Sequence, residues 1–273
     1  MERRSGDAGL AHVVRIALLA LLMAFGSLAQ AQIADINSAI NKAGRQRMLS
    51  QRMAKAYLQI GLNVDLERSK RTLDGAIALF DRQLVELKNF APTPQIRDTY
   101  LQLEQNWLAY KDVLIGSVPS PDGARKVLEL SESVLRLAHA GTEQLVSTSG
   151  SESGPLVGVA GRQRMLSQRI AKFYLAQVWG VAPAGGAAVA AELDKSRRAF
   201  AMGLKALAGA PATTPAIREE LELAHRHWQQ YEHALDAREP GERRTRAASV
   251  AASSERVLDT MDTITGMFEK LGG

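Results

Sequence analysis

One ten-residue segment of the sequence combines three arginines with a glycine and a serine. It occurs twice without change, at 43–52 and 160–169 (AGRQRMLSQR). Arginine binds planar oxyanions well because its guanidinium fork donates parallel hydrogen bonds. The stretch 42–55 carries five cations and no acidic residue, so these charges have no partner close in sequence. The repeated segment is therefore the candidate for chemistry in this chain, and the chemistry it predicts is the binding of a small anion.

The spacing of the segment places Arg47 on the inner stripe of an expected helix, together with Ala43 and Ser50. Small neighbours allow another helix to approach, so the guanidinium would be partly dehydrated, which is costly without a partner. Gly44 costs about 1 kcal/mol relative to alanine inside a helix, which indicates a close backbone approach or a bend. We predict that Arg47 and Arg164 face each other with an anion between them. The alternative is that the arginines pair with acids of other helices or extend into solvent.

The predicted ligand-binding residues are the glycines, arginines and serines of both copies: Gly44, Arg45, Arg47, Ser50, Arg52, Gly161, Arg162, Arg164, Ser167 and Arg169. The tryptophans and tyrosines that follow in each copy lie on apolar stripes, and we expect them in the core: Trp107, Tyr110, Trp228 and Tyr231.

Catalytic function has little support in the sequence. Three histidines lie close together, but their spacing does not place three metal ligands on one helical face: His225, His227 and His233. The chain has no cysteine, which excludes thiolate metal sites and cysteine nucleophiles. No Ser-His-Asp pattern, phosphate loop or paired-carboxylate motif stands out. We therefore expect no enzyme activity, no metal and no cofactor.

The repeat extends well beyond the ten residues and organises the whole chain. Thr-Pro pairs at 93–94 and 214–215 each precede an Ile-Arg pair, and a tryptophan and a tyrosine follow at equal spacing in both copies. Apolar residues at helical spacing mark four helices per copy, with Thr93-Pro94 as a cap and first-turn proline. Nothing alternates like a strand. The expected fold is all-α, with two tandem up-down four-helix bundles.

The predicted boundaries follow from the repeat and from the breaker residues. Residues 32–146 form the first module and 156–273 the second, with a flexible Ser/Gly linker at 147–155. Within the modules, breaks between helices are expected at 119–123, 181–188 and Pro240-Gly241.

The first 31 residues read as a secretory signal peptide. Arginines precede an uncharged apolar run at 16–29, and Ala29-Gln30-Ala31 fits a cleavage site after Ala31. The apolar run is short for a membrane span, and an uncleaved inner-membrane anchor is the alternative. We therefore expect a periplasmic protein. The net charge of +5 would permit contact with nucleic acid, but export argues against it and favours a site for a small anion.

Residues 43–58 and 160–175 resemble the opening helix of the PilJ-type domain of type IV pili methyl-accepting chemotaxis proteins. They are also similar to the related periplasmic sensor domain of nitrate/nitrite-responsive histidine kinases. Those nitrate sensors carry Ala-Gly-x-x-Arg-Met-x-Ser-x-Arg, and the resemblance implies that the arginine before the methionine, Arg47 or Arg164, grips the anion where two first helices pair. The resemblance covers essentially the whole mature chain as two domains, although the sharp motif is this helix alone. Arginine follows the glycine here (Arg45, Arg162), which predicts a more basic pocket and a different ligand.

The receptors of this family have a second membrane span and cytoplasmic signalling modules, and neither is seen in the sequence up to Gly273. We therefore expect a sensory protein that holds a small, nitrate-like oxyanion and acts with a separate membrane receptor or a type IV pilus chemosensory system. The alternative is a non-catalytic helical adaptor that docks a protein or envelope partner through its duplicated basic face. The sequence leaves open whether the modules pair within one chain or between two chains of a homodimer, and whether both copies bind.

Overall fold

The computed structural model describes residues 33–182, 186–237 and 243–271, and in these ranges it contains eight α-helices and no strand. The helices are α2 (Ile36–Gly61), α3 (Leu66–Phe90), α4 (Pro94–Ile115), α5 (Pro121–Ser149), α6 (Gly154–Trp179), α7 (Ala187–Ala208), α8 (Pro215–Asp236) and α9 (Arg243–Lys270). The predicted all-α class and four helices per copy are confirmed. The signal peptide predicted for 1–31 and the break at Pro240-Gly241 lie outside the described residues. None of the described helices is long and apolar enough to span a bilayer.

Capping residues determine where several helices begin. The Thr93 hydroxyl accepts a hydrogen bond from the backbone N–H of Ile96 at 3.3 Å, and Thr214 caps α8 through Ile217 at the same distance. In each case proline takes the first helical turn, where its missing N–H costs nothing. The two Thr-Pro pairs therefore act as the helix starts that the sequence predicts.

The connection between the two copies is shorter than the predicted linker. Helix α5 continues to Ser149 and α6 begins at Gly154, so only 150–153 lie outside the helices. The connection is also tied down, because Ser153 accepts a hydrogen bond from the Asn37 amide at 3.0 Å and bonds Ser151 at 2.9 Å. The segment is a fixed turn between α5 and α6.

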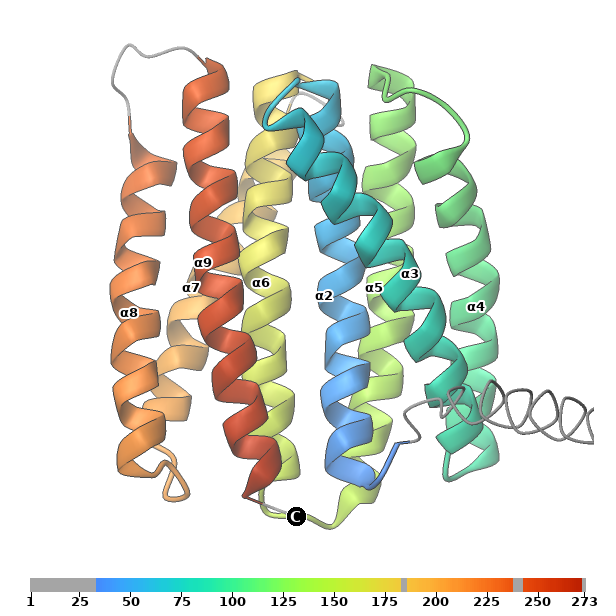
Figure 1. Ribbon diagram of the computed structural model, residues 1–273, viewed down its shortest axis with the longest axis vertical. Helices are drawn as coiled ribbons and strands as arrows, with labels where there is room; N and C mark the ends of the chain where they lie inside the picture. The colour runs from blue at the N-terminus through green and yellow to red at the C-terminus, as the bar shows by residue number, and fades with distance from the viewer. Residues whose placement is uncertain (1–32, 183–185, 238–242, 272–273) are drawn as a thin grey trace, which may run out of the picture. The chain divides into compact units, whose positions relative to one another are not determined.

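The two opening helices, α2 and α6, pack against each other along the centre of the bundle (Figure 1). In the first copy α2 also packs on α3 and α5, and α4 packs on α5. The second copy repeats this plan with α6 on α7 and α9, and α8 on α9. Residues 33–273 form one compact unit. The two copies are thus paired within one chain, through the helices that carry the arginine segments.

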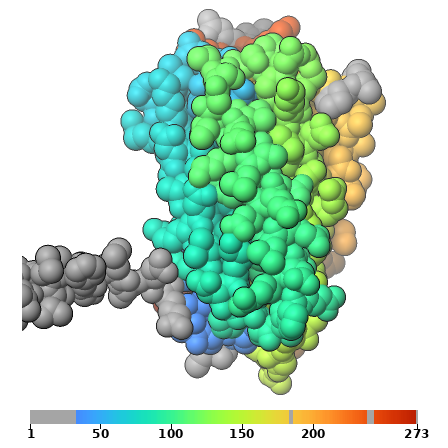
Figure 2. Space-filling model, turned by 90° about the vertical axis from the view of Figure 1, so that its right-hand side faces the viewer, coloured from blue at the N-terminus to red at the C-terminus, as the bar shows by residue number. Residues whose placement is uncertain are grey.

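The aromatic residues of each copy lie in the core and hold the opening helix in place. Trp107 packs on Phe80 with ring centroids 4.2 Å apart, and Trp228 packs on Phe200 at 4.3 Å. The hydroxyl of Tyr110 donates to the carbonyl of Ser50 at 2.9 Å, and Tyr231 bonds Ser167 in the same way. The predicted core role of all four tryptophans and tyrosines is confirmed. Figure 2 shows α3, α4 and α5 covering the outer face of the first copy.

Candidate functional site

The two arginine segments meet where Gly44 of α2 faces Gly161 of α6. A Cβ atom added to Gly44 would lie 3.6 Å from the Cα of Gly161, and one added to Gly161 would lie 3.7 Å from the Cα of Gly44. This is the close backbone approach that the glycine predicts. The added Cβ atoms would each lie 3.2 Å from Nη2 of Arg164, and 3.4 and 3.5 Å from Nη2 of Arg47. The structure therefore brings the two guanidinium groups together at the glycine crossing.

Each of these arginines reaches across to the backbone of the other helix. Nη2 of Arg47 donates to the carbonyl of Gly158 at 3.0 Å, and Nη2 of Arg164 donates to the carbonyl of Asn41 at 3.0 Å. The side chains are 1% and 0% exposed. Among the described residues, Nε of Arg47 and Nε of Arg164 have no hydrogen-bond partner. Each guanidinium thus has one buried N–H donor, at Nε, that makes no hydrogen bond in the described structure.

Burial lowers the pKa of both arginines to about 10. For Arg47 the charge of Arg164 lowers the pKa further, while Glu143 opposes the shift. Two like charges in a dehydrated seam repel each other, and each pays the cost of losing water. A negative charge placed between them would offset both effects.

The acidic partners of the two arginines differ. Asp262 of α9 pairs with Arg164 and also with Arg45, at 3.0 Å in the second case. In α5 the equivalent position holds His139, whose Nδ1 lies 3.3 Å from Nη1 of Arg47. Glu143 pairs with Arg47 only at 3.7 Å. The second copy therefore carries a close carboxylate that the first copy lacks.

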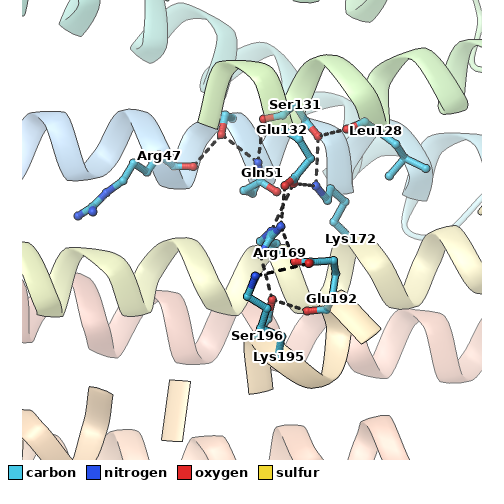
Figure 3. Close-up of polar contacts among 11 residues, drawn as sticks. Arg47, Gln51, Leu128, Ser131, Glu132, Arg169, Lys172, Glu192, Lys195 and Ser196 are labelled. Atoms are coloured by element: carbon cyan, nitrogen blue, oxygen red, sulfur yellow. Dashed lines mark hydrogen bonds and ion pairs between the residues drawn. The ribbon is translucent and has the colours of Figure 1, made fainter. Parts of the chain in front are cut away.

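A second set of charges links the copies crosswise, as Figure 3 shows for one half. Glu132 of α5, in the first copy, accepts from Arg169 at 2.6 Å and from the buried Lys172, both in the second copy. Reciprocally, Glu255 of α9 pairs with Arg52 and Lys55 of the first copy. Burial alone would raise the pKa of each glutamate, but the facing lysine and arginine outweigh it and hold the pKa at about 2.

The remaining predicted site residues lie away from the glycine crossing. The hydroxyls of Ser50 and Ser167 donate to the carbonyls of Arg47 and Arg164 at 2.8 Å, so they bond their own helices. Arg162 is exposed beside α7. Arg52 and Arg169 form the ion pairs between the two copies. The structure thus assembles the two glycines, Arg47 and Arg164, with Arg45 at the edge.

The acids and the histidine that face the arginines are not among the residues predicted from the sequence. They come from the fourth helix of each copy, far from the repeated segment. One signal was present, because Ser-Glu-x-Val-Leu occurs at 131–135 and again at 254–258. The histidines predicted to be non-ligands lie elsewhere: His225 and His233 are exposed on α8, and His227 bonds Thr260 at 2.9 Å.

Comparison with known proteins agrees with the repeated architecture. The family model described as type IV pili methyl-accepting chemotaxis transducer N-term (PilJ) matches residues 28–131 and again 145–259. Domains of this family are the periplasmic sensory parts of chemotaxis transducers. No curated protein and no solved structure shows a significant match. With two matches that together cover most of its length, the chain belongs to the PilJ family of type IV pili chemotaxis transducer N-terminal domains.

Proposed function

We propose that this chain is a periplasmic sensory module that binds one small oxyanion between Arg47 and Arg164. The observation that carries the proposal is the convergence of two buried guanidinium groups on the Gly44–Gly161 crossing, each with an unbonded Nε. Arginine donors in a dehydrated seam bind anions strongly because little water competes for them.

The Arg47 side of the crossing favours the ligand. On the other side, the carboxylate of Asp262 already neutralises Arg164 and Arg45, and so takes the place of an anion. Beside Arg47 lie His139 and Glu143, whose side chains are 49% and 57% exposed, so this side of the crossing borders solvent. The two copies are therefore proposed to form one site, with Asp262 as its permanent counter-charge and Arg47 as the group that gains a partner.

Membership of the family suggests a signalling role for anion binding. The chain belongs to a family of chemotaxis transducer domains, and a ligand that binds one conformation more tightly than another shifts the equilibrium toward it. We propose that the chain acts with a separate membrane receptor or with the type IV pilus chemosensory system. Docking through a duplicated basic face receives less support, because Arg47, Arg164, Lys55 and Lys172 are buried inside the bundle.

Isothermal titration of the purified protein with nitrate, nitrite, sulfate and phosphate at low salt tests the proposal. We expect saturable binding of one anion per chain, lost in Arg47→Gln and Arg164→Gln and retained in Arg162→Gln, which alters an exposed arginine of the same segment. Circular dichroism of each variant shows that it is folded. Absence of heat from every anion, or equal loss in Arg162→Gln, would contradict the buried site.

A further inference from the structure

A groove of about 730 Å³ lies between α7 and α8 in the second copy. Its floor is apolar and includes Leu204, Leu221 and the indole of Trp228. The volume falls in the range of small-molecule sites, which is roughly 300–1,000 Å³. The groove lies on the outer side of the bundle, away from the glycine crossing and its arginines, so it is independent of the proposed anion site.

In the first copy, ion pairs bridge the equivalent helices α3 and α4. Lys88 of α3 pairs with Glu104 of α4 at 2.5 Å, and Lys111 of α4 pairs with Asp81 of α3 at 2.6 Å. Asp81 also accepts a hydrogen bond from Nε1 of Trp107 at 2.7 Å. These contacts clamp α3 to α4 across the stacked Phe80 and Trp107.

The second copy lacks every member of this clamp. The stacked Phe200–Trp228 pair fixes the alignment, and it places Ala201 and Ala208 where Asp81 and Lys88 stand in the first copy. On α8, His225 and Glu232 take the positions of Glu104 and Lys111. Arg197 of α7 instead pairs with Glu232 of α8 at 3.5 Å and with Asp236 at 2.9 Å, and the groove lies beside these pairs, where alanines take the place of Asp81 and Lys88.

The groove carries an indole and an excess of positive charge. The Trp228 indole packs on its phenylalanine and tyrosine much as Trp107 does, and Ala201, at the position of Asp81, offers its Nε1 no side-chain acceptor. Three cations line the rim, namely Lys205, Arg218 and Arg226, together with two acids, Glu222 and Glu232. None of the three cations has an ion-pair partner among the described residues, while Glu232 is engaged by Arg197, so the rim keeps an excess of positive charge.

We propose that the α7–α8 groove binds a small carboxylic acid with a flat apolar body. The body lies on Leu204, Leu221 and the face of Trp228, where burial of apolar surface stabilises it. The carboxylate takes the N–H of Trp228 and the rim cations, and so replaces the lost Asp81-type acceptor. A helical peptide segment is the other kind of occupant that an apolar groove accommodates, and the charge dependence of binding separates the two.

The test uses a naphthalene carboxylate as probe, with its neutral methyl ester and the naphthylmethylammonium ion as matched controls. Ligand-observed NMR gives the affinities, and the indole N–H signals of the tryptophans report the place. We expect the acid to bind the purified protein with a dissociation constant on the order of 1 mM, as suits a fragment of this size. The Trp228 signal should shift while that of Trp107 stays fixed. The ester and the ammonium ion should bind at least about tenfold more weakly.

Two variants make the test decisive. The first transplants the clamp of the first copy (Ala201→Asp, Ala208→Lys, His225→Glu and Glu232→Lys) and should abolish acid binding while keeping the helical fold. The second, Lys205→Gln with Arg218→Gln and Arg226→Gln, changes exposed side chains only and should reduce acid binding to that of the ester. Binding that is equal for acid and ester, or unchanged in either folded variant, would overturn the proposal. So would absence of binding to the unmodified protein.

Discussion

At the scale of single residues, the site is defined by a difference between two nearly identical halves. Arg164 faces the carboxylate of Asp262, whereas Arg47 faces the imidazole of His139 at the matching position. Burial and the charge of Arg47 lower the pKa of His139, so the ring stays neutral at pH 7 and its Nδ1 accepts from the guanidinium. The carboxylate nearest to Arg47 is therefore that of Glu143, 3.7 Å away and half exposed, whereas Asp262 contacts Arg164 directly.

Replacing His139 by aspartate should place a carboxylate of the protein itself in the proposed anion site. The new carboxylate would sit beside Arg47 as Asp262 sits beside Arg164, and it would compete with any added anion. We expect His139→Asp to weaken oxyanion affinity by at least about tenfold, which corresponds to about 1.4 kcal/mol, measured by titration calorimetry. The matched control, His139→Asn, adds no charge and should bind nearly as well as the unmodified protein. Equal affinity in both variants would place the anion elsewhere.

The glycine crossing makes a second prediction at this scale. In Gly44→Ala the new Cβ would lie 3.2 Å from Nη2 of Arg164, a group that its hydrogen bond to Asn41 holds in place. We expect a loss of about 1 kcal/mol in the free energy of unfolding, measured by urea denaturation. Gly75→Ala is the control, since no atom lies within 4 Å of its added Cβ, and it should gain about 0.5–1 kcal/mol from helix propensity. A stabilised Gly44→Ala protein would mean that the crossing is loosely packed.

At the scale of helices, the fourth helix of each copy serves both copies. Glu255 of α9 neutralises Lys55 and Arg52 on α2, and Glu132 of α5 does the same for Lys172 and Arg169 on α6. Lys55 and Lys172 are 1% and 0% exposed, so each needs its glutamate to stay charged inside the bundle. The exchange of acids locks α2 to α9 and α6 to α5.

This locking predicts a dependence of stability on acid. The pKa of Glu255 is about 2 in the folded protein, below its ordinary value of 4.5. Its contribution is therefore fully present above pH 4.5 and is lost as the pH falls toward 2, because the unfolded chain takes up the proton first. We expect the loss to reach about 3 kcal/mol for Glu255, the more buried glutamate, as measured by urea denaturation across this range. In Glu255→Gln the protein should be less stable at pH 7 by a similar amount, and its free energy of unfolding should change less between pH 4.5 and 2. If the free energy of unfolding depends on pH as it does in the unmodified protein, Lys55 and Arg52 do not hold Glu255 in its charged form.

The elements themselves could be read from the sequence, but the contacts between them could not. The stripe through Ala43, Arg47 and Ser50 predicts a helix and its buried face, and Thr93-Pro94 predicts where another begins. The partners of Lys55 and Arg164 stand some 100 to 200 residues away, and helical periodicity says nothing about such distances. Only the matched Ser-Glu pairs of the fourth helices indicate a shared role for these acids. Their partners follow from the positions of α5 and α9 in the fold.

At the scale of the whole molecule, duplication puts both halves of a paired structure in one chain. Because the copies exchange Glu132 and Glu255, the buried Lys55 and Lys172 each take their carboxylate from the other copy. Arg169 also pairs with Glu192 of its own copy at 2.9 Å, so it is the lysines whose charge depends on the pairing of the copies. The turn at 150–153 supplies the second copy permanently and allows the two halves to diverge, as His139 and Asp262 have done.

Separating the copies tests this dependence. Residues 32–149 alone should form a homodimer through α2, in which Glu132 of each protomer pairs with Arg52 and Lys55 of the other. Light scattering coupled to size-exclusion chromatography measures the mass, and Glu132→Gln should weaken the dimer by on the order of tenfold or more. A stable, folded monomer of this fragment would contradict the interlocked arrangement.

The most direct measurement of the central claim follows the arginine side chains themselves during anion binding. In spectra of ¹⁵N-labelled arginine, the Nε–H groups of Arg47 and Arg164 should shift on titration with the oxyanion, because they have no partner in the described structure. The Nε–H groups of Arg52 and Arg169, which already donate to Glu255 and Glu132 at 3.3 Å, serve as internal references and should stay fixed. Shifts confined to Arg47 and Arg164 would establish the buried anion site. Shifts spread evenly over all arginines, or confined to exposed ones, would contradict it.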